Sequence, residues 1–126
     1  MNRDGKLDFA VSNNGSSSIS VVLGDGRFGF TAQTPRGVGI KPCKIVHLDL
    51  NRDGKPDLAV VNSTSGTLAL LLGNGAGGFS SASSVNATGG FGPTPTGLDV
   101  GDFNHDGIPD LLVGDFNTGC WPLLGQ

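Results

Sequence analysis

The sequence contains no glutamate and no tyrosine, and charged residues make up only 15% of it. All 11 acidic residues are therefore aspartates, and the net charge of −3 gives no basic surface for binding DNA or RNA. No apolar run is long enough to cross a bilayer, and no signal peptide precedes the first motif, so we expect no membrane insertion. The two cysteines, Cys43 and Cys120, provide no disulfide framework; we interpret both as buried thiols and leave their pairing open.

The composition favours short strands joined by tight turns, because 22 glycines accompany runs of valine, leucine, serine and threonine. A segment that begins at Asn2 recurs at Asn51 and Asn104. LDFAVSNNGSSSISVVLGDGRFGF aligns with PDLAVVNSTSGTLALLLGNGAGGF, and PDLLVGDFNTGCWPLLG repeats the pattern with one residue missing before Gly125. We therefore predict one repeat array over residues 1–126, with repeats at about 1–41, 42–94 and 95–126, of which the first and last are incomplete.

Each repeat predicts the same series of antiparallel strands, with apolar residues on both faces. A first strand is expected at Lys44–Leu48 and Gly97–Gly101, and a second at Asp8–Ser12, Asp57–Asn62 and Asp110–Gly114. A third is expected at Ser18–Leu23, Thr67–Leu72 and Cys120–Leu124, and a fourth begins at Phe30 and Phe79. The predicted fold is all-β, a β-propeller segment of about two and a half four-stranded antiparallel blades with ten strands. Because propellers close with about 4–8 blades, we expect the chain to be a fragment or to close by self-association.

Oxygen-bearing side chains occupy positions 1, 3, 5 and 9 of a loop between the first and second strands. In the second repeat these are Asp49, Asn51, Asp53 and Asp57, with the main-chain carbonyl of Lys55; in the third they are Asp102, Asn104, Asp106 and Asp110, with the carbonyl of Ile108. Glycine at position 6 permits the left-handed turn that wraps the loop around a centre. Hard oxygen donors without cysteine or histidine favour Ca²⁺ over zinc or copper, and Mg²⁺ requires a stricter octahedron.

The first repeat departs from this pattern, because the leading aspartate is missing. Its remaining candidate ligands are Asn2, Asp4, Asp8 and the carbonyl of Lys6. A positive α-amino group at Met1 also lies beside the loop, so we predict that this site binds calcium much more weakly than the other two, or not at all.

Three alternatives share the loop composition. A solvated Asp/Asn/Gly-rich turn is disfavoured because the pattern recurs and uses eight of the eleven acidic residues. An EF-hand needs a glutamate at position 12, where Val60 and Val113 stand, and it needs flanking helices. A dockerin-type module also requires helices after its loops, whereas strands are predicted here.

The paired motifs resemble those of the FG-GAP / VCBS repeat family. Its pattern D-x-N-x-D-G-x-x-D-L-x-V is met at Asp49–Val60 and Asp102–Val113, and its companion L-G-N-G-x-G-G-F at Leu72–Phe79 and, as LGDGRFGF, at Leu23–Phe30. The resemblance implies calcium-binding β-propeller blades, as in the integrin α head, some secreted lectins and many bacterial surface proteins. It also implies a ring of seven or a similar number of blades, with calcium in the loop between first and second strands.

We expect a non-enzymatic protein. His47 alternates within a strand and is interpreted as packed or half-exposed, and His105 as a solvated loop residue. Trp121 aligns with Ile19 and Leu68 and is expected in the core. Five polar segments are expected at the opposite end of the predicted blades: the turns Asn13–Ser17, Asn62–Gly66 and Asp115–Gly119 and the links Thr34–Pro42 and Asn86–Thr96. Two interpretations of these segments remain open, plain solvated turns and a ligand-binding face.

The predicted function is that of a calcium-binding extracellular or cell-surface scaffold for adhesion, or for binding a protein or glycan. Extracellular calcium modules of this kind bind at about 10⁻⁴–10⁻³ M, so they fill outside cells and stay largely empty in the cytosol. Two alternatives are a carbohydrate-binding lectin propeller and the accessory propeller of a larger secreted enzyme. The identity of the ligand and the number of blades are left open.

Overall fold

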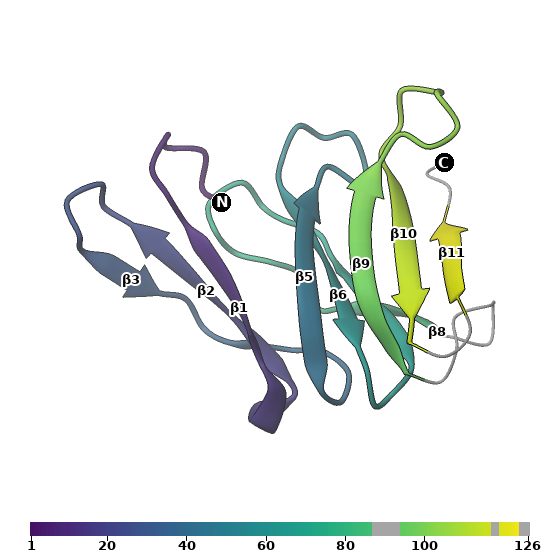
Figure 1. Ribbon diagram of the computed structural model, residues 1–126. Helices are drawn as coiled ribbons and strands as arrows, with labels where there is room; N and C mark the ends of the chain where they lie inside the picture. Colours follow the sequence, from purple (N-terminus) through teal and green to yellow (C-terminus); the bar gives the residue numbers. More distant parts are fainter. Residues whose placement is uncertain (87–93, 117–118, 124–126) are drawn as a thin grey trace.

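The computed structural model describes residues 1–86, 94–116 and 119–123 (Figure 1). Within these ranges the chain forms eleven strands and one short 3-10 helix. In chain order the elements are β1 (Phe9–Asn13), η1 (Asn14–Ser16), β2 (Ser18–Gly24), β3 (Phe30–Ala32), β4 (Arg36–Gly37), β5 (Pro42–Leu48), β6 (Asp57–Asn62), β7 (Thr67–Leu71), β8 (Ser83–Asn86), β9 (Pro95–Gly101), β10 (Asp110–Asp115) and β11 (Gly119–Leu123).

The strands form three antiparallel sheets, one for each predicted repeat. The first has the order β1-β2-β3, with β4 also paired to β2, the second β5-β6-β7-β8, and the third β11-β10-β9. The all-β propeller segment of about two and a half blades is thus confirmed. The described residues contain one strand more than predicted, because the fourth strand of the first repeat is divided into β3 and β4.

The fourth strand of the second repeat begins later than predicted. Phe79 forms only an isolated bridge with Gly73, and the continuous strand starts at Ser83. Phe79 is nevertheless buried, at 5% exposure, and packs between the first and second sheets. Packing in the core therefore fixes the position of the Phe79 side chain, and continuous strand pairing begins only at Ser83.

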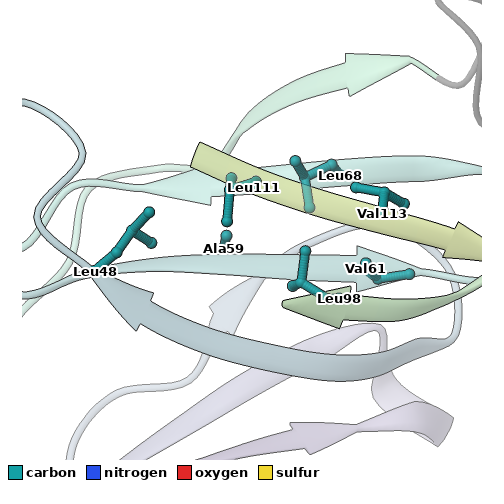
Figure 2. Close-up of a cluster of buried hydrophobic side chains, with 7 residues drawn as sticks. All are labelled: Leu48, Ala59, Val61, Leu68, Leu98, Leu111 and Val113. Carbon is teal, nitrogen blue, oxygen red and sulfur yellow. The ribbon is translucent and has the colours of Figure 1, made fainter. Parts of the chain in front are cut away.

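The central sheet is buried on both faces. Successive side chains of its strands point in opposite directions, so each face packs against one of the two neighbouring sheets. Leu58 and Val60 of β6 pack against the first sheet, in a cluster that includes Ile19 and Val21 of β2. Ala59 and Val61 pack against the third sheet. Figure 2 shows this second cluster, which comprises Leu48, Ala59, Val61, Leu68, Leu98, Leu111 and Val113. The two-sided apolar pattern of the sequence therefore corresponds to one sheet stacked between two others.

The three sheets are arranged so that β5 lies between β1 and β9 (Figure 1). The loops 1–8, 49–56 and 102–109 all emerge at the same end of the sheets (Figure 1). The turns from β1 to β2 and from β6 to β7 lie at the opposite end (Figure 1). Of the remaining polar segments predicted there, the link 86–96 and the turn 115–119 include residues outside the described ranges.

The alignment of the third repeat needs a correction of one residue. Leu68 pairs with Val61, and the corresponding partner of Gly114 is Cys120, so Trp121 occupies the place of Ala69. The missing residue falls in the turn before β11 and not before Gly125, because a turn can lose a residue without changing strand register. Trp121 is half-buried and packs against the cluster between the second and third sheets.

The prediction that both cysteines are buried is wrong. Cys43 and Cys120 are free thiols, and both are exposed. The thiol of Cys43 lies 3.6 Å from the carbonyl of Val61 and 3.8 Å from that of Pro95, and its partial desolvation raises its pKa.

Candidate metal centre

The three aspartate loops share one backbone conformation. The fourth position is left-handed in each loop although it carries a side chain, with φ of 64° at Arg3, 59° at Arg52 and 60° at His105. The glycine at the sixth position is also left-handed, with φ of 78° at Gly5, 75° at Gly54 and 79° at Gly107. His105 is exposed, as expected for a solvated loop residue. The recurrence of two left-handed residues per loop shows that the sequence pattern specifies a closed turn.

In the second repeat, side-chain oxygens face the backbone of their own loop. The two carboxylate oxygens of Asp49 accept hydrogen bonds from the amides of Asp53 (3.1 Å) and Gly54 (2.9 Å). The amide of Asp53 also donates to Oδ1 of Asn51 at 3.2 Å. Oδ1 of Asp53 accepts from the amide of Lys55 at 2.9 Å. The oxygens at positions 1, 3 and 5 thus organise the loop through its N–H groups.

The third repeat reproduces these hydrogen bonds at equivalent positions. Asp102 accepts from the amides of Asp106 (3.0 Å) and Gly107 (2.9 Å). Oδ1 of Asn104 accepts from the amide of Asp106 at 3.0 Å, and Oδ1 of Asp106 accepts from that of Ile108 at 2.7 Å. The two full loops are therefore alike in conformation and in hydrogen bonding.

The aspartate at position 9 connects the loop to the sheet. Asp57 and its counterpart Asp110 are both 0% exposed. Oδ2 of Asp57 accepts from the amide of Leu50 at 2.8 Å, and its Oδ1 accepts from the amide of Gly73 at 2.7 Å. In the third repeat Oδ2 of Asp110 accepts from the amide of Phe103 at 2.9 Å. This carboxylate therefore joins both ends of the loop and, in the second repeat, the end of the third strand.

Sequence reasoning missed the role of the glycine whose amide donates a hydrogen bond to this carboxylate. A side chain at Gly73 would collide with the carbonyl of Pro56, and one at Gly24 with the carbonyl of Leu7. The amide of Gly24 donates to Oδ1 of Asp8 at 3.0 Å, as Gly73 does to Asp57. The signal was present in the Leu-Gly pair that begins both companion motifs.

The lysine at the seventh position of two loops lowers the pKa of a neighbouring carboxyl through its amide or its ammonium group. The Lys55 ammonium lies 2.9 Å from Oδ2 of Asp53, and this hydrogen bond, with a second from the Lys55 amide, lowers the pKa of Asp53. The amide of Lys6 is the main cause that lowers the pKa of Asp4. Both carboxyls are at the surface, so solvent screens these interactions.

The first loop differs from the other two at its entry. The amino group of Met1 forms an ion pair with Asp8, which also accepts from the amide of Asn2 at 3.2 Å. Desolvation lowers the pKa of this amino group, and the nearby Asp4 opposes the shift. Oδ1 of Asn2 accepts from the amide of Asp4 at 3.3 Å. Asn2, Asp4 and Asp8 thus accept hydrogen bonds equivalent to those in the full loops, and the Met1 nitrogen contacts Asp8 as the Leu50 amide contacts Asp57.

The described ranges contain no group of three or more His, Cys, Asp or Glu side chains arranged to hold a metal ion. The carboxylates of the two full loops accept backbone N–H groups in this arrangement. A carboxylate oxygen has two lone pairs, so an oxygen that accepts one N–H hydrogen bond keeps a lone pair that can coordinate a cation. The donor set therefore fits a hard divalent cation, and the ligand assignments stay predictions.

Comparison with known proteins gives one match. The family model of the FG-GAP-like repeat matches residues 1–60 and again residues 49–113. No curated protein matches the chain. No solved structure matches it either. Among the described residues, no helix is sufficiently long and apolar to cross a membrane.

Proposed function

The chain belongs to the FG-GAP-like repeat family, and from this premise we propose that it is a calcium-binding, non-enzymatic β-propeller segment that acts as an extracellular scaffold for adhesion or ligand binding. The observation that carries the proposal is the repetition of one loop geometry. Both full copies combine oxygen donors at positions 1, 3, 5 and 9 with left-handed residues at positions 4 and 6.

The ligands proposed for calcium come from two loops. They are Asp49, Asn51, Asp53, Asp57 and the Lys55 carbonyl in the second repeat, and Asp102, Asn104, Asp106, Asp110 and the Ile108 carbonyl in the third. Three carboxylates close together repel one another, and a bound divalent cation offsets that repulsion. Calcium would therefore fix the path from the first strand to the second in each blade, which is a structural role.

The Lys55 ammonium competes with a cation for Asp53 in the second loop. Because the side chains of Lys55 and Asp53 are 39% and 31% exposed, their ion pair is weak and screened by salt. The third loop has Ile108 at this position and no such competitor. We therefore expect the third loop to bind calcium at least as tightly as the second, and the first loop to bind most weakly.

An extracellular location is supported by the type of site. Calcium modules outside cells bind at about 10⁻⁴–10⁻³ M, a range in which cytosolic calcium leaves the sites largely empty. A non-enzymatic role is part of the proposal because the loop carboxylates that could act in hydrolysis are the ones proposed to hold calcium. Adhesion or ligand binding is proposed for the opposite end, where the turn after β1 carries asparagine and serine and the turn after β6 carries serine and threonine.

The proposal predicts that calcium stabilises the fold. A ligand at ten times its Kd adds about 1.4 kcal/mol per site to the free energy of unfolding, which raises the melting temperature by several degrees. We expect a thermal melt followed by circular dichroism to shift upward in millimolar calcium and to fall with excess chelator. Asp53→Ala and Asp106→Ala should each remove about half of the calcium-dependent shift.

Asp99→Ala is the control of equal charge change, because Asp99 is exposed on β9 and lies outside the loops. It should leave the calcium-dependent shift unchanged. Identical melting curves of the unmodified chain in calcium and in chelator would refute the proposal. A shift that survives in the double variant Asp53→Ala/Asp106→Ala would show that calcium acts elsewhere.

A further inference from the structure

The turn that follows β7 lies against the last positions of the second aspartate loop. A side chain at Gly73 would collide with the carbonyl of Pro56, and the amide of Gly73 donates to Oδ1 of Asp57 at 2.7 Å. A Cβ at Gly75 would lie 3.2 Å from Cδ of Lys55 and 3.4 Å from its Cγ. The loop is therefore supported from behind by a turn that is distant in sequence.

The two parts of the Lys55 side chain have different surroundings. Its aliphatic stem crosses Gly75, which is left-handed with φ of 77° and has no side chain to keep the stem away. Its ammonium group lies 2.9 Å from Oδ2 of Asp53, and the Lys55 amide donates to Oδ1 of the same carboxylate at 2.9 Å. The residue is thus held by Asp53 on one side and by Gly75 on the other.

The first repeat has the same arrangement. A Cβ at Gly26 would lie 3.5 Å from Cγ of Lys6 and 3.6 Å from its Cδ. The amide of Lys6 donates to Oδ1 of Asp4 at 2.9 Å, and its ammonium lies 3.7 Å from Oδ2 of Asp4. Because two copies place the lysine stem over the same glycine, the contact belongs to the repeat pattern. The third loop has Ile108 at this position and therefore no ammonium group.

From these contacts we propose that the Lys55 side chain positions the Lys55 carbonyl for calcium, and that its stem and its ammonium change calcium affinity in opposite directions. This inference rests on the calcium-binding function proposed above. The stem, held over Gly75, restricts rotation of the residue whose carbonyl is a proposed ligand. A group that is already oriented loses less conformational entropy on binding, so the stem favours binding. The ammonium opposes binding because it occupies an oxygen of Asp53.

The test compares Lys55→Met with Lys55→Ala. Methionine keeps an unbranched stem without the charge, and alanine removes both, so the two variants differ only in the stem. Calcium titrations of the whole chain, followed by ¹H–¹⁵N NMR, give the midpoint of the second loop from the Gly54 amide and that of the third from the Gly107 amide.

We expect Lys55→Met to bind calcium at the second loop about two- to fivefold more tightly than the unmodified chain, because a surface ion pair is removed. Lys55→Ala should bind about threefold or more weakly than Lys55→Met, because its carbonyl is less well oriented. The Gly107 midpoint should be the same in all three proteins. In the unmodified chain the Gly75 resonance should titrate with the Gly54 midpoint, since the stem joins the loop to the turn.

Equal Gly54 midpoints in the two variants, or tighter binding by Lys55→Ala, would overturn the role of the stem. Weaker binding by Lys55→Met than by the unmodified chain would overturn the opposing role of the ammonium. A Gly107 midpoint that moves with either variant would contradict a local positioning role. Absence of any shift at Gly54 and Gly107 in the unmodified chain would instead refute calcium binding itself, so the two failures are distinguishable.

Discussion

The turn that follows the third strand of a blade depends on a single side-chain oxygen. Oδ1 of Asp25 accepts from the amides of Arg27 (2.6 Å) and Gly29 (2.9 Å). Asn74 has the same role in the second repeat, since its Oδ1 accepts from the amides of Ala76 (2.8 Å) and Gly78 (3.0 Å). The two residues are geometric equivalents, but only aspartate can titrate.

We predict that the first of these turns responds to acid and the second does not. The amides of Arg27 and then Gly29 lower the pKa of Asp25 below its ordinary value of 3.8. A lowered folded-state pKa means that the stabilisation is present above the unfolded pKa and is lost as the pH falls through the folded pKa. Carboxyl titration by NMR should give a midpoint for Asp25 below 3.8. Asp25→Asn should keep the turn and remove this contribution to the pH dependence of stability. A midpoint at or above the ordinary value would contradict the prediction.

Single residues also show where sequence reasoning stopped. The oxygen positions of the loops were readable because they recur at fixed spacing, and the left-handed glycine at position 6 followed from steric rules. The second partner of Asp57 was not readable, because the amide of Gly73 is distant in sequence and reaches it only through the hairpin. Proximity of this kind belongs to the folded chain and leaves no local pattern.

Among the elements, the second strands of the blades differ most in their surroundings. β6 is buried along its whole length, whereas β1 is exposed at Phe9 and Val11. The sequences of the two strands have the same apolar pattern, so the difference arises from the neighbours that each sheet has in space. Burial therefore distinguishes β1 from β6 although composition does not.

Equivalent truncations in these strands should have unequal costs. Leu58→Ala removes a side chain that is 0% exposed and packed between sheets, and we expect a loss of about 2–5 kcal/mol in the free energy of unfolding. Phe9→Ala at the equivalent position, which is 48% exposed, should cost about 1 kcal/mol or less. Urea denaturation of the two variants measures both values. Equal losses would show that the sheets do not stack as described.

Strand positions were predictable where the apolar pattern is strong, and less so where it is weak. β6 has the predicted bounds, because each of its residues faces a packed neighbour. The fourth strand of the first repeat begins at Phe30 as predicted but is divided into β3 and β4, and that of the second begins at Ser83 instead of Phe79. These strands are short and mostly exposed. Whether the residues of a fourth strand pair depends on the free edge of the third strand, and their polar sequence does not predict that pairing.

The whole molecule places its three aspartate loops at one end of three stacked sheets (Figure 1). Duplication in the sequence was sufficient to predict this arrangement, because equal repeats that stack must present equal loops on the same side. The position of the missing residue in the third repeat was not predictable, since a gap anywhere between Val113 and Gly125 aligns almost equally well. The register of β10 with β11 decides it.

The most direct test of calcium binding uses the glycine at position 6 of each loop as a reporter. The amides of Gly54 and Gly107 donate to Asp49 and Asp102, the leading proposed ligands, and Gly5 is their counterpart in the loop without that aspartate. In a calcium titration followed by ¹H–¹⁵N NMR, we predict that the Gly54 and Gly107 resonances shift and saturate with midpoints of about 10⁻⁴–10⁻³ M. Gly5 should shift only at higher concentration or not at all. Unchanged Gly54 and Gly107 resonances at calcium about ten times above that range would contradict the account.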